Sequence, residues 1–237
     1  MIVFLLLLLF SFAAFILGLW LYLYTWWTMG TCHNQESLAG KCAILTGGTS
    51  GVGKETATEV AKRGANVIIG ARNQRQNVIH AMQEAAGNDN IELWDLDLMD
   101  MESVTSFAQR VKERDLKIDL LINNAGIFFH PDQKDTIQVN FQGHFQLTNF
   151  LEKNLKNNAR IINVSSCFNR FSNGNVDLSG IDYSNYLEVY NTSKLMMIMF
   201  TRELERRWGD RGITSFSLHP GYVDTNIFMA HPWKSFC

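Results

Sequence analysis

Cysteine is scarce in this sequence, and neither sign of charge is in excess. The four cysteines are scattered among 237 residues, without a CxxC pair or a histidine cluster at metal-ligand spacing. This pattern argues against a disulfide framework or a zinc site and suits a reducing compartment. The 21 basic and 23 acidic residues give a formal net charge of −2, and the basic residues form no run. Nucleic acid is therefore not an expected partner.

Charged side chains are also absent from the first 31 residues, of which Ile2 to Trp27 are almost wholly apolar. In a helix, about 20 apolar residues span the hydrocarbon core of a membrane. We predict a transmembrane anchor over residues 1–30 and a linker over residues 31–39. A cleaved signal peptide is the alternative, but the length of the run and the lack of basic residues before it favour the anchor. Aromatic residues, which prefer the membrane interface, gather at its C-terminal end: Trp20, Tyr22, Tyr24, Trp26 and Trp27.

After Gly40, short apolar runs alternate with amphipathic stretches to the end of the chain. Runs that are apolar on both faces, each followed by a helical pattern, predict a parallel sheet covered by helices on both sides. The expected fold of residues 40–237 is therefore α/β, a doubly wound parallel sheet of the Rossmann type. The expected strands are 41–46, 66–71, 91–95, 118–123, 160–165 and 213–219, and the expected helices lie near 52–63, 73–86, 100–114, 136–157 and 188–208.

A glycine-rich segment, TGGTSGVG over residues 46–53, joins the first expected strand to the first expected helix. Glycines let the backbone approach a pyrophosphate closely, and the helix N-terminus offers N–H donors and a partial positive charge. A tight turn would use glycines as well. The position between strand and helix favours a dinucleotide site.

The spacing of this segment is TGxxxGxG, and four further motifs follow it in order. Together the five motifs resemble those of the short-chain dehydrogenase/reductase family, over residues 40–227, and are closest to its membrane-anchored, retinol-dehydrogenase-like branch. The resemblance implies an NAD(P)-dependent oxidoreductase that acts on CH–OH groups. The later motifs are NNAG at 123–126, Ser165-Ser166, YNTSK at 190–194 and HPG at 219–221.

The end of the second expected strand bears on the choice of cofactor. NAD-specific dinucleotide folds usually place an acidic residue there, but this chain has Ala71-Arg72-Asn73. A guanidinium can pair with a 2′-phosphate, and in the resembling family an arginine here accompanies NADP. We expect NADP(H), with NAD(H) as the alternative; a surface arginine without a ligand is the competing interpretation of Arg72. The resemblance implies cofactor contacts at Gly47, Thr49, Ser50, Gly51, Val52, Gly53, Arg72, Asp97, Asn124, Ala125, Gly126, Tyr190, Lys194, Pro220, Gly221, Val223 and Thr225.

Tyr190 and Lys194 are four residues apart, so a helix would place them on one face. A nearby ammonium favours a phenolate, and we expect it to lower the tyrosine pKa from near 10 so that the phenol can exchange protons with the substrate. The resemblance implies that Ser166 holds the substrate oxygen, with Ser165 as its competitor. It also implies that Asn140 organises a water-mediated proton path to the lysine.

Two residues close in sequence to the motif residues could be mistaken for catalytic groups. His144 is expected to be packed rather than catalytic. Cys167 has no evident histidine partner and is expected to be a small neutral neighbour of Ser166.

The sequence departs from the family pattern at two places. The segment from Gly126 to Asn140 is several residues shorter than in the retinol-dehydrogenase-like branch. The chain also stops twelve residues after Thr225, whereas the family continues through a substrate-covering loop, a seventh strand and a last helix. We therefore expect either a truncated product or a pocket that is closed by other means.

The anchor favours a lipophilic substrate, and the 24 residues from Ser166 to Tyr190 resemble the retinol dehydrogenase branch. A retinol or retinal-like substrate is the first expectation, and a steroid or fatty carbonyl is the alternative. A catalytically impaired, membrane-bound nucleotide-binding module is the alternative of another class. We expect the lipid bilayer as a partner, a homodimer as in many family members, and residence in the endoplasmic reticulum membrane. Glycosylation sequons at Asn163 and Asn191 fall inside the catalytic elements, which favours a catalytic domain facing the cytosol.

Overall fold

A computed structural model describes residues 2–28, 36–72, 76–221 and 223, and it divides the chain into two compact units, Met1–Glu36 and Ser37–Cys237. The first unit contains helix α1 (Ile2–Thr28), in which the rings of Trp20 and Tyr24 stack with centroids 5.4 Å apart. Among the residues that the structure describes, none of the helices combines the length and the apolar character that crossing a membrane requires. The predicted transmembrane anchor is therefore not confirmed.

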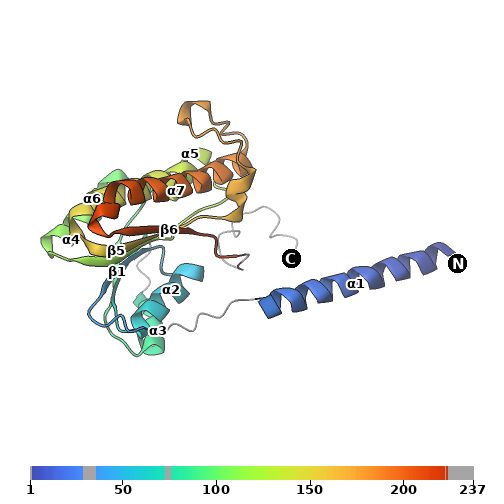
Figure 1. The fold of residues 1–237 in the computed structure, drawn as a ribbon, viewed down its shortest axis with the longest axis horizontal. Helices are drawn as coiled ribbons and strands as arrows, with labels where there is room; N and C mark the ends of the chain where they lie inside the picture. Colours follow the sequence, from blue (N-terminus) through green and yellow to red (C-terminus); the bar gives the residue numbers. More distant parts are fainter. Residues whose placement is uncertain (1, 29–35, 73–75, 222, 224–237) are drawn as a thin grey trace. The chain divides into compact units, whose positions relative to one another are not determined.

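The second unit is built on a six-stranded sheet in which all the paired strands are parallel, in the order β3-β2-β1-β4-β5-β6. This confirms the doubly wound Rossmann-type prediction. Helices α2 and α3 cover one face, and α4, α6 and α7 cover the other (Figure 1). The strands are β1 (Cys42–Thr46), β2 (Asn66–Ala71), β3 (Ile91–Asp95), β4 (Ile118–Asn123), β5 (Leu155–Val164) and β6 (Thr214–Leu218), and the helices are α2 (Gly51–Lys62), α3 (Gln76–Ala86), α4 (Met101–Glu113), α5 (Gln133–Ile137), α6 (Gly143–Phe150) and α7 (Tyr186–Trp208).

The two faces of the sheet have different cores. On the α2 and α3 face, small Ala57 and Ala61 let α2 lie close to the sheet, and Ile79 and Met82 fill the space beneath α3. On the opposite face, larger side chains from α4, α6 and α7 pack together on the strands, among them Phe107, Leu147, Phe200, Leu204 and Trp208. Burial on both faces explains why the central strands β1 and β2 are nearly continuous apolar runs.

Strand β1 lies between β2 and β4, so the chain winds outward in both directions from the centre of the sheet. At such a switch point the loops that follow the two neighbouring strands diverge and leave a crevice at their carboxyl ends. The glycine-rich segment follows β1, and the NNAG motif includes the end of β4. The fold therefore places these two motifs side by side.

The long helix expected over 136–157 is confirmed only as far as Phe150 and is wrong beyond it. The chain forms α5, then a π-helix η1 (Gln138–Gln142), α6 and a 3₁₀ turn η2 (Glu152–Asn154), and β5 already begins at Leu155. Asn158 adopts a positive φ of 64°, and the pairing of β4 with β5 changes register near this point. Because asparagine tolerates the left-handed conformation, it permits this irregular start of the strand.

Candidate active site

A cavity of about 610 Å³ opens at the carboxyl ends of the strands, at the switch point of the sheet. Of the predicted site residues, Asn140 lies outside the cavity lining, and Thr225 lies outside the described residues. The others contribute to its wall: Gly47, Thr49, Ser50, Gly51, Val52, Gly53, Arg72, Asp97, Asn124, Ala125, Gly126, Ser166, Tyr190, Lys194, Pro220, Gly221 and Val223.

Close backbone packing explains two of the glycines at the turn after β1. Gly47 has a φ of +72°, and a Cβ atom there would lie 2.9 Å from the Cα of Ala125. A Cβ on Gly53 would lie 2.3 Å from the carbonyl oxygen of Gly47 and 2.5 Å from Nδ2 of Asn124. Side chains at these positions would therefore push the start of α2 away from the NNAG turn.

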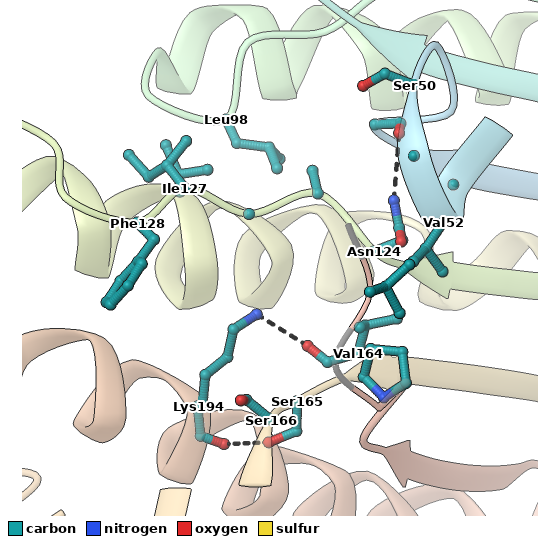
Figure 2. Close-up of a pocket in the computed structure, with 18 of the residues that line it drawn as sticks. Ser50, Val52, Leu98, Asn124, Ile127, Phe128, Val164, Ser165, Ser166 and Lys194 are labelled. Carbon is teal, nitrogen blue, oxygen red and sulfur yellow. Dashed lines mark hydrogen bonds between the residues drawn. The ribbon is translucent and has the colours of Figure 1, made fainter. Parts of the chain in front are cut away.

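Thr46 and Asn124 join the two turns by hydrogen bonds. The backbone N–H groups of Asn124 and Ala125 both donate to Thr46 Oγ1, each at 3.0 Å. In return, Asn124 Nδ2 donates to the carbonyl oxygen of Gly47 at 3.3 Å (Figure 2) and to that of Thr46 at 2.9 Å. Sequence reasoning missed this function of Thr46, although the threonine is the first letter of the TGxxxGxG motif.

Three further groups are arranged as a dinucleotide would need. Ser50 is the N-cap of α2, and among the described contacts its side chain caps none of the helix N–H groups, so these donors remain for an anion. Arg72 is exposed at the end of β2, with Nη1 3.7 Å from the sulfur of Met99. Asp97 holds the loop after β3 by accepting from the Met99 N–H at 2.9 Å. The residues present therefore fit a phosphate-bearing dinucleotide.

Tyr190 and Lys194, both on α7, face this cavity across from the glycine turn. Tyr190 is 8% exposed and Lys194 is 3% exposed. Lys194 Nζ lies 5.7 Å from the centre of the Tyr190 ring and donates to the carbonyl oxygen of Val164 at 3.0 Å (Figure 2). The predicted one-face arrangement is therefore present, and the lysine is held by the end of β5.

The pKa of Tyr190 is shifted in the direction opposite to the one predicted from the sequence. Burial raises the pKa of Tyr190 above 10; a hydrogen bond with Ser166 opposes this, and the proximity of Cys167 adds to it. The prediction that Lys194 brings this pKa below its usual value is wrong for the structure as it stands, because desolvation of the phenol outweighs the stabilising contacts. Burial also lowers the pKa of Lys194 from 10.5 to about 8.

The two candidate serines have different environments. Ser165 Oγ donates to the backbone carbonyl of Lys194 at 2.8 Å, which fastens β5 to α7. Ser166 Oγ accepts from the Phe168 N–H at 3.3 Å, and its hydroxyl opposes the rise in the Tyr190 pKa. The geometry therefore favours Ser166 as the serine that meets a substrate oxygen beside the phenol.

Asn140 is fully buried in the π-helix η1. Its side chain accepts from the Ile127 N–H at 2.8 Å and donates to the Ile127 carbonyl at 3.0 Å and to Ser193 Oγ at 3.1 Å. It thereby connects the loop after β4 to α7. A Cβ on Gly126 would lie 3.3 Å from Asn140 Oδ1 and 3.4 Å from Lys194 Nζ, so both polar groups approach this glycine. The predicted proton path through Asn140 stays a prediction.

Sequence reasoning also missed the aromatic side chains around Tyr190. The Phe128 ring lies 4.4 Å from the Tyr190 ring between centroids, and the Phe168 ring lies 6.3 Å from it. Both phenylalanines line the cavity. Their signal in the sequence is their position, each two residues after the last residue of the NNAG or the Ser-Ser motif.

A glycine turn at the switch point of a parallel sheet, facing a buried Tyr–Lys pair, is the arrangement of a nicotinamide-dependent dehydrogenase. Comparison with known proteins agrees. Residues 41–234 match the family described as short chain dehydrogenase. The chain belongs to this family of NAD(P)-dependent oxidoreductases.

Two human proteins and one solved structure indicate the closeness of the match. Retinol dehydrogenase 11 is 37% identical over 223 residues, which cover 87% of this chain and 70% of that protein. Retinol dehydrogenase 13 is 36% identical over 215 residues, which cover 84% of this chain and 64% of that protein. The chain thus spans about two thirds of these relatives. A crystal structure of a short chain dehydrogenase from Burkholderia cenocepacia, in complex with NADP, aligns with a TM-score of 0.67 at 30% identity and covers 81% of this chain and 78% of that chain.

Proposed function

We propose that the protein is an NADP(H)-dependent oxidoreductase that interconverts a lipophilic alcohol and its carbonyl. The observation that carries this proposal is the meeting of Ser166, Tyr190 and Lys194 in the same cavity as the glycine turn. The nicotinamide, when bound, supplies the hydride in reduction and accepts it in oxidation. The protein residues supply the proton and hold the reacting oxygen.

In the direction of reduction, Ser166 donates a hydrogen bond to the carbonyl oxygen and Tyr190 transfers its hydroxyl proton to that oxygen. The phenolate that remains lies near the Lys194 ammonium, which stabilises it and allows its reprotonation from solvent. In oxidation the proton leaves the alcohol by the same route in reverse. Because burial holds the phenol neutral, Tyr190 enters the cycle ready to donate a proton.

The preference for NADP(H) is supported by Arg72 and by a solved relative. Arg72 lines the cavity at the end of β2, where a carboxylate would repel a 2′-phosphate. The Burkholderia cenocepacia structure, a complex with NADP, has the same fold. NAD(H) is the alternative. Asn73, the residue after Arg72, lies outside the described residues.

A retinol or retinal-like substrate is supported by the two retinol dehydrogenases among the relatives and by the aromatic side chains of Phe128 and Phe168 at the cavity. A steroid or a fatty carbonyl is the alternative. The test is loss of nicotinamide absorbance when the full chain in detergent is given NADPH and retinal. Absence of turnover with a panel of lipophilic carbonyls, alongside tight NADPH binding, would instead support the nucleotide-binding module.

We also propose that α1 associates with lipid, in keeping with the expected endoplasmic reticulum membrane. The support is its large apolar side chains, which are exposed, Leu17 at 57% and Leu21 at 46%. The full chain should float with phosphatidylcholine vesicles, and the variant that combines Leu17→Glu with Leu21→Glu should float less. Leu178→Glu, an exposed leucine of the other unit, is the control. Equal flotation of all three would contradict the proposal.

Pairing of two copies is a further proposal, based on the family resemblance. The exposed Phe145 on α6 and Met199 on α7 are the support within the chain, at 40% and 48% exposure. Light scattering should give twice the mass of one chain, and Met199→Lys should lower it. A single-chain mass for the parent protein would contradict the pairing.

A further inference from the structure

His144 is a fully buried imidazole that the mechanism does not use. It lies on α6, one turn after Asn140, and its two ring nitrogens face two parts of the site. Nε2 lies 2.8 Å from Thr46 Oγ1, and Nδ1 lies 3.4 Å from the backbone carbonyl oxygen of Asn140. One side chain therefore connects the cofactor turn with the π-helix that holds Asn140.

The hydrogen bonds of Thr46 determine which nitrogen carries the proton. A threonine hydroxyl has one hydrogen to donate and two lone pairs that accept. The N–H groups of Asn124 and Ala125 occupy both lone pairs, each at 3.0 Å. The hydroxyl hydrogen must therefore point at His144, whose Nε2 has to be the unprotonated acceptor. The ring proton then lies on Nδ1 and is directed at the Asn140 carbonyl, which can only accept.

We propose that His144 is a positioning residue of the cofactor site, because its Nε2 fixes the Thr46 hydroxyl in the orientation that holds the Asn124 and Ala125 amides. This deepens the proposed function, on which it rests. If no acceptor faced Thr46, its hydroxyl hydrogen would seek another partner, and a lone pair would turn away from one of the two amides. The NNAG turn would then lose part of its attachment to the glycine turn.

The surroundings of the ring keep it in the neutral form that this function requires. Burial and the charge of Lys194 lower the pKa of His144 to about 3, against the opposing effect of the Asn140 carbonyl. An imidazolium would carry a proton on Nε2 and could not accept from Thr46. The same lysine that serves the reaction thus also favours the neutral imidazole.

The first experiment reads the ring directly and does not depend on catalysis. In the full chain with ¹⁵N-labelled histidine, the His144 signals, identified by their loss in His144→Phe, should show a protonated Nδ1 and an unprotonated Nε2. This pattern should persist from pH 7 to pH 5. A proton on Nε2 at pH 7 would overturn the proposal.

The second experiment measures the affinity for NADPH by fluorescence. Glutamine can place an acceptor near the position of Nε2, whereas asparagine is too short, so His144→Gln should bind nearly as well as the parent and His144→Asn about tenfold more weakly. Thr46→Val should lose a similar factor, and Thr46→Ser, which keeps the hydroxyl, should retain the affinity. The variant with both Thr46→Val and His144→Asn should be no weaker than the poorer single variant, because the two side chains act through one interaction.

The outcomes separate this inference from the proposed function. Parent protein that fails to bind NADPH contradicts the proposed function, while the histidine signals still test the tautomer. Parent protein that binds NADPH, with equal affinity in His144→Asn and His144→Gln, overturns the positioning role. Losses that add in the double variant would also overturn it, since they would indicate packing at two independent sites.

Discussion

The cofactor side and the substrate side of the cavity are built in different ways. On the cofactor side, backbone atoms of separate turns touch, and buried groups such as Thr46 and His144 bond to residues distant in sequence. After the lining residues Cys167 and Phe168, the chain continues into the segment from 172 to 185, which contributes no residue to the described cavity lining. This segment is mostly exposed and held largely by local bonds, such as Asp177 accepting from Ser179 and Asp182 accepting from Ser184. A cofactor that does not change permits rigid long-range contacts, whereas an exposed segment held locally can vary because little else depends on it.

Tyr190→Phe should produce the largest effect and should separate the chemical step from the binding of NADPH. Removal of the hydroxyl eliminates the proton donor, so turnover should fall by about 10²-fold or more. The NADPH affinity should stay nearly unchanged, because the ring and the glycine turn remain. Steady-state rates and fluorescence titration measure the two quantities. Turnover equal to that of the parent would remove Tyr190 from its role.

Gly53→Ala should instead weaken the binding of NADPH on the cofactor side of the cavity. The added methyl would lie 2.3 Å from the Gly47 carbonyl oxygen, so the start of α2 must move. We expect NADPH to bind about 100-fold more weakly. Ala57→Gly, one turn further along the same helix, serves as the control for general weakening of α2. If the two variants bind NADPH equally well, the close approach at Gly53 has no role in the site.

Arg72→Asp should change the selectivity of the cofactor side without disabling it. A carboxylate repels the 2′-phosphate and can accept from the ribose hydroxyls, so the ratio of NADPH to NADH affinity should fall by about 30-fold. Arg63→Asp, on the same unit but outside the cavity lining, is the matched control. An unchanged ratio in Arg72→Asp would refute the phosphate contact.

Phe168→Ala should affect the substrate side alone. Loss of the ring beside Tyr190 removes apolar contact area, and KM for retinal should rise about tenfold while the NADPH affinity is kept. Phe171→Ala, at an exposed position of the same 3₁₀ segment, is the control. A rise in KM for both variants would mean that the segment as a whole, rather than the Phe168 ring, sets the affinity.

The last effect concerns stability in acid rather than activity. The folded protein keeps His144 neutral down to a pKa of about 3, whereas the unfolded chain protonates it near 6.5. Between these values the unfolded state binds more protons, so the free energy of unfolding should fall as the pH falls, by up to about 1.4 kcal/mol per pH unit. Urea titrations at pH 7, 6 and 5 measure it. His144→Gln should reduce this slope, and identical slopes would exclude His144 as its source.

The central strands could be predicted closely because burial on both faces leaves a simple apolar pattern, as in Cys42–Thr46 and Asn66–Ala71. The stretch 136–157 could not, since its helical pattern hides a π-helix and a left-handed Asn158. Motif spacing located Tyr190, Lys194 and Ser166. It could not give the direction of the shift in the Tyr190 pKa, which depends on burial, or the contact of His144 with Thr46, which comes from a strand 98 residues away.

The reciprocal bonds between β5 and α7 have a consequence for how such proteins can diverge. Ser165 donates to the Lys194 carbonyl, and Lys194 Nζ donates to the Val164 carbonyl, so strand and helix are locked in one register. A residue added within 190–194 would break that register and displace the phenol. Residues added between η3 (Cys167–Phe171) and α7 would lengthen only an exposed segment that contributes no residue to the described cavity lining. Insertions there can therefore be accommodated while the reacting groups keep their places.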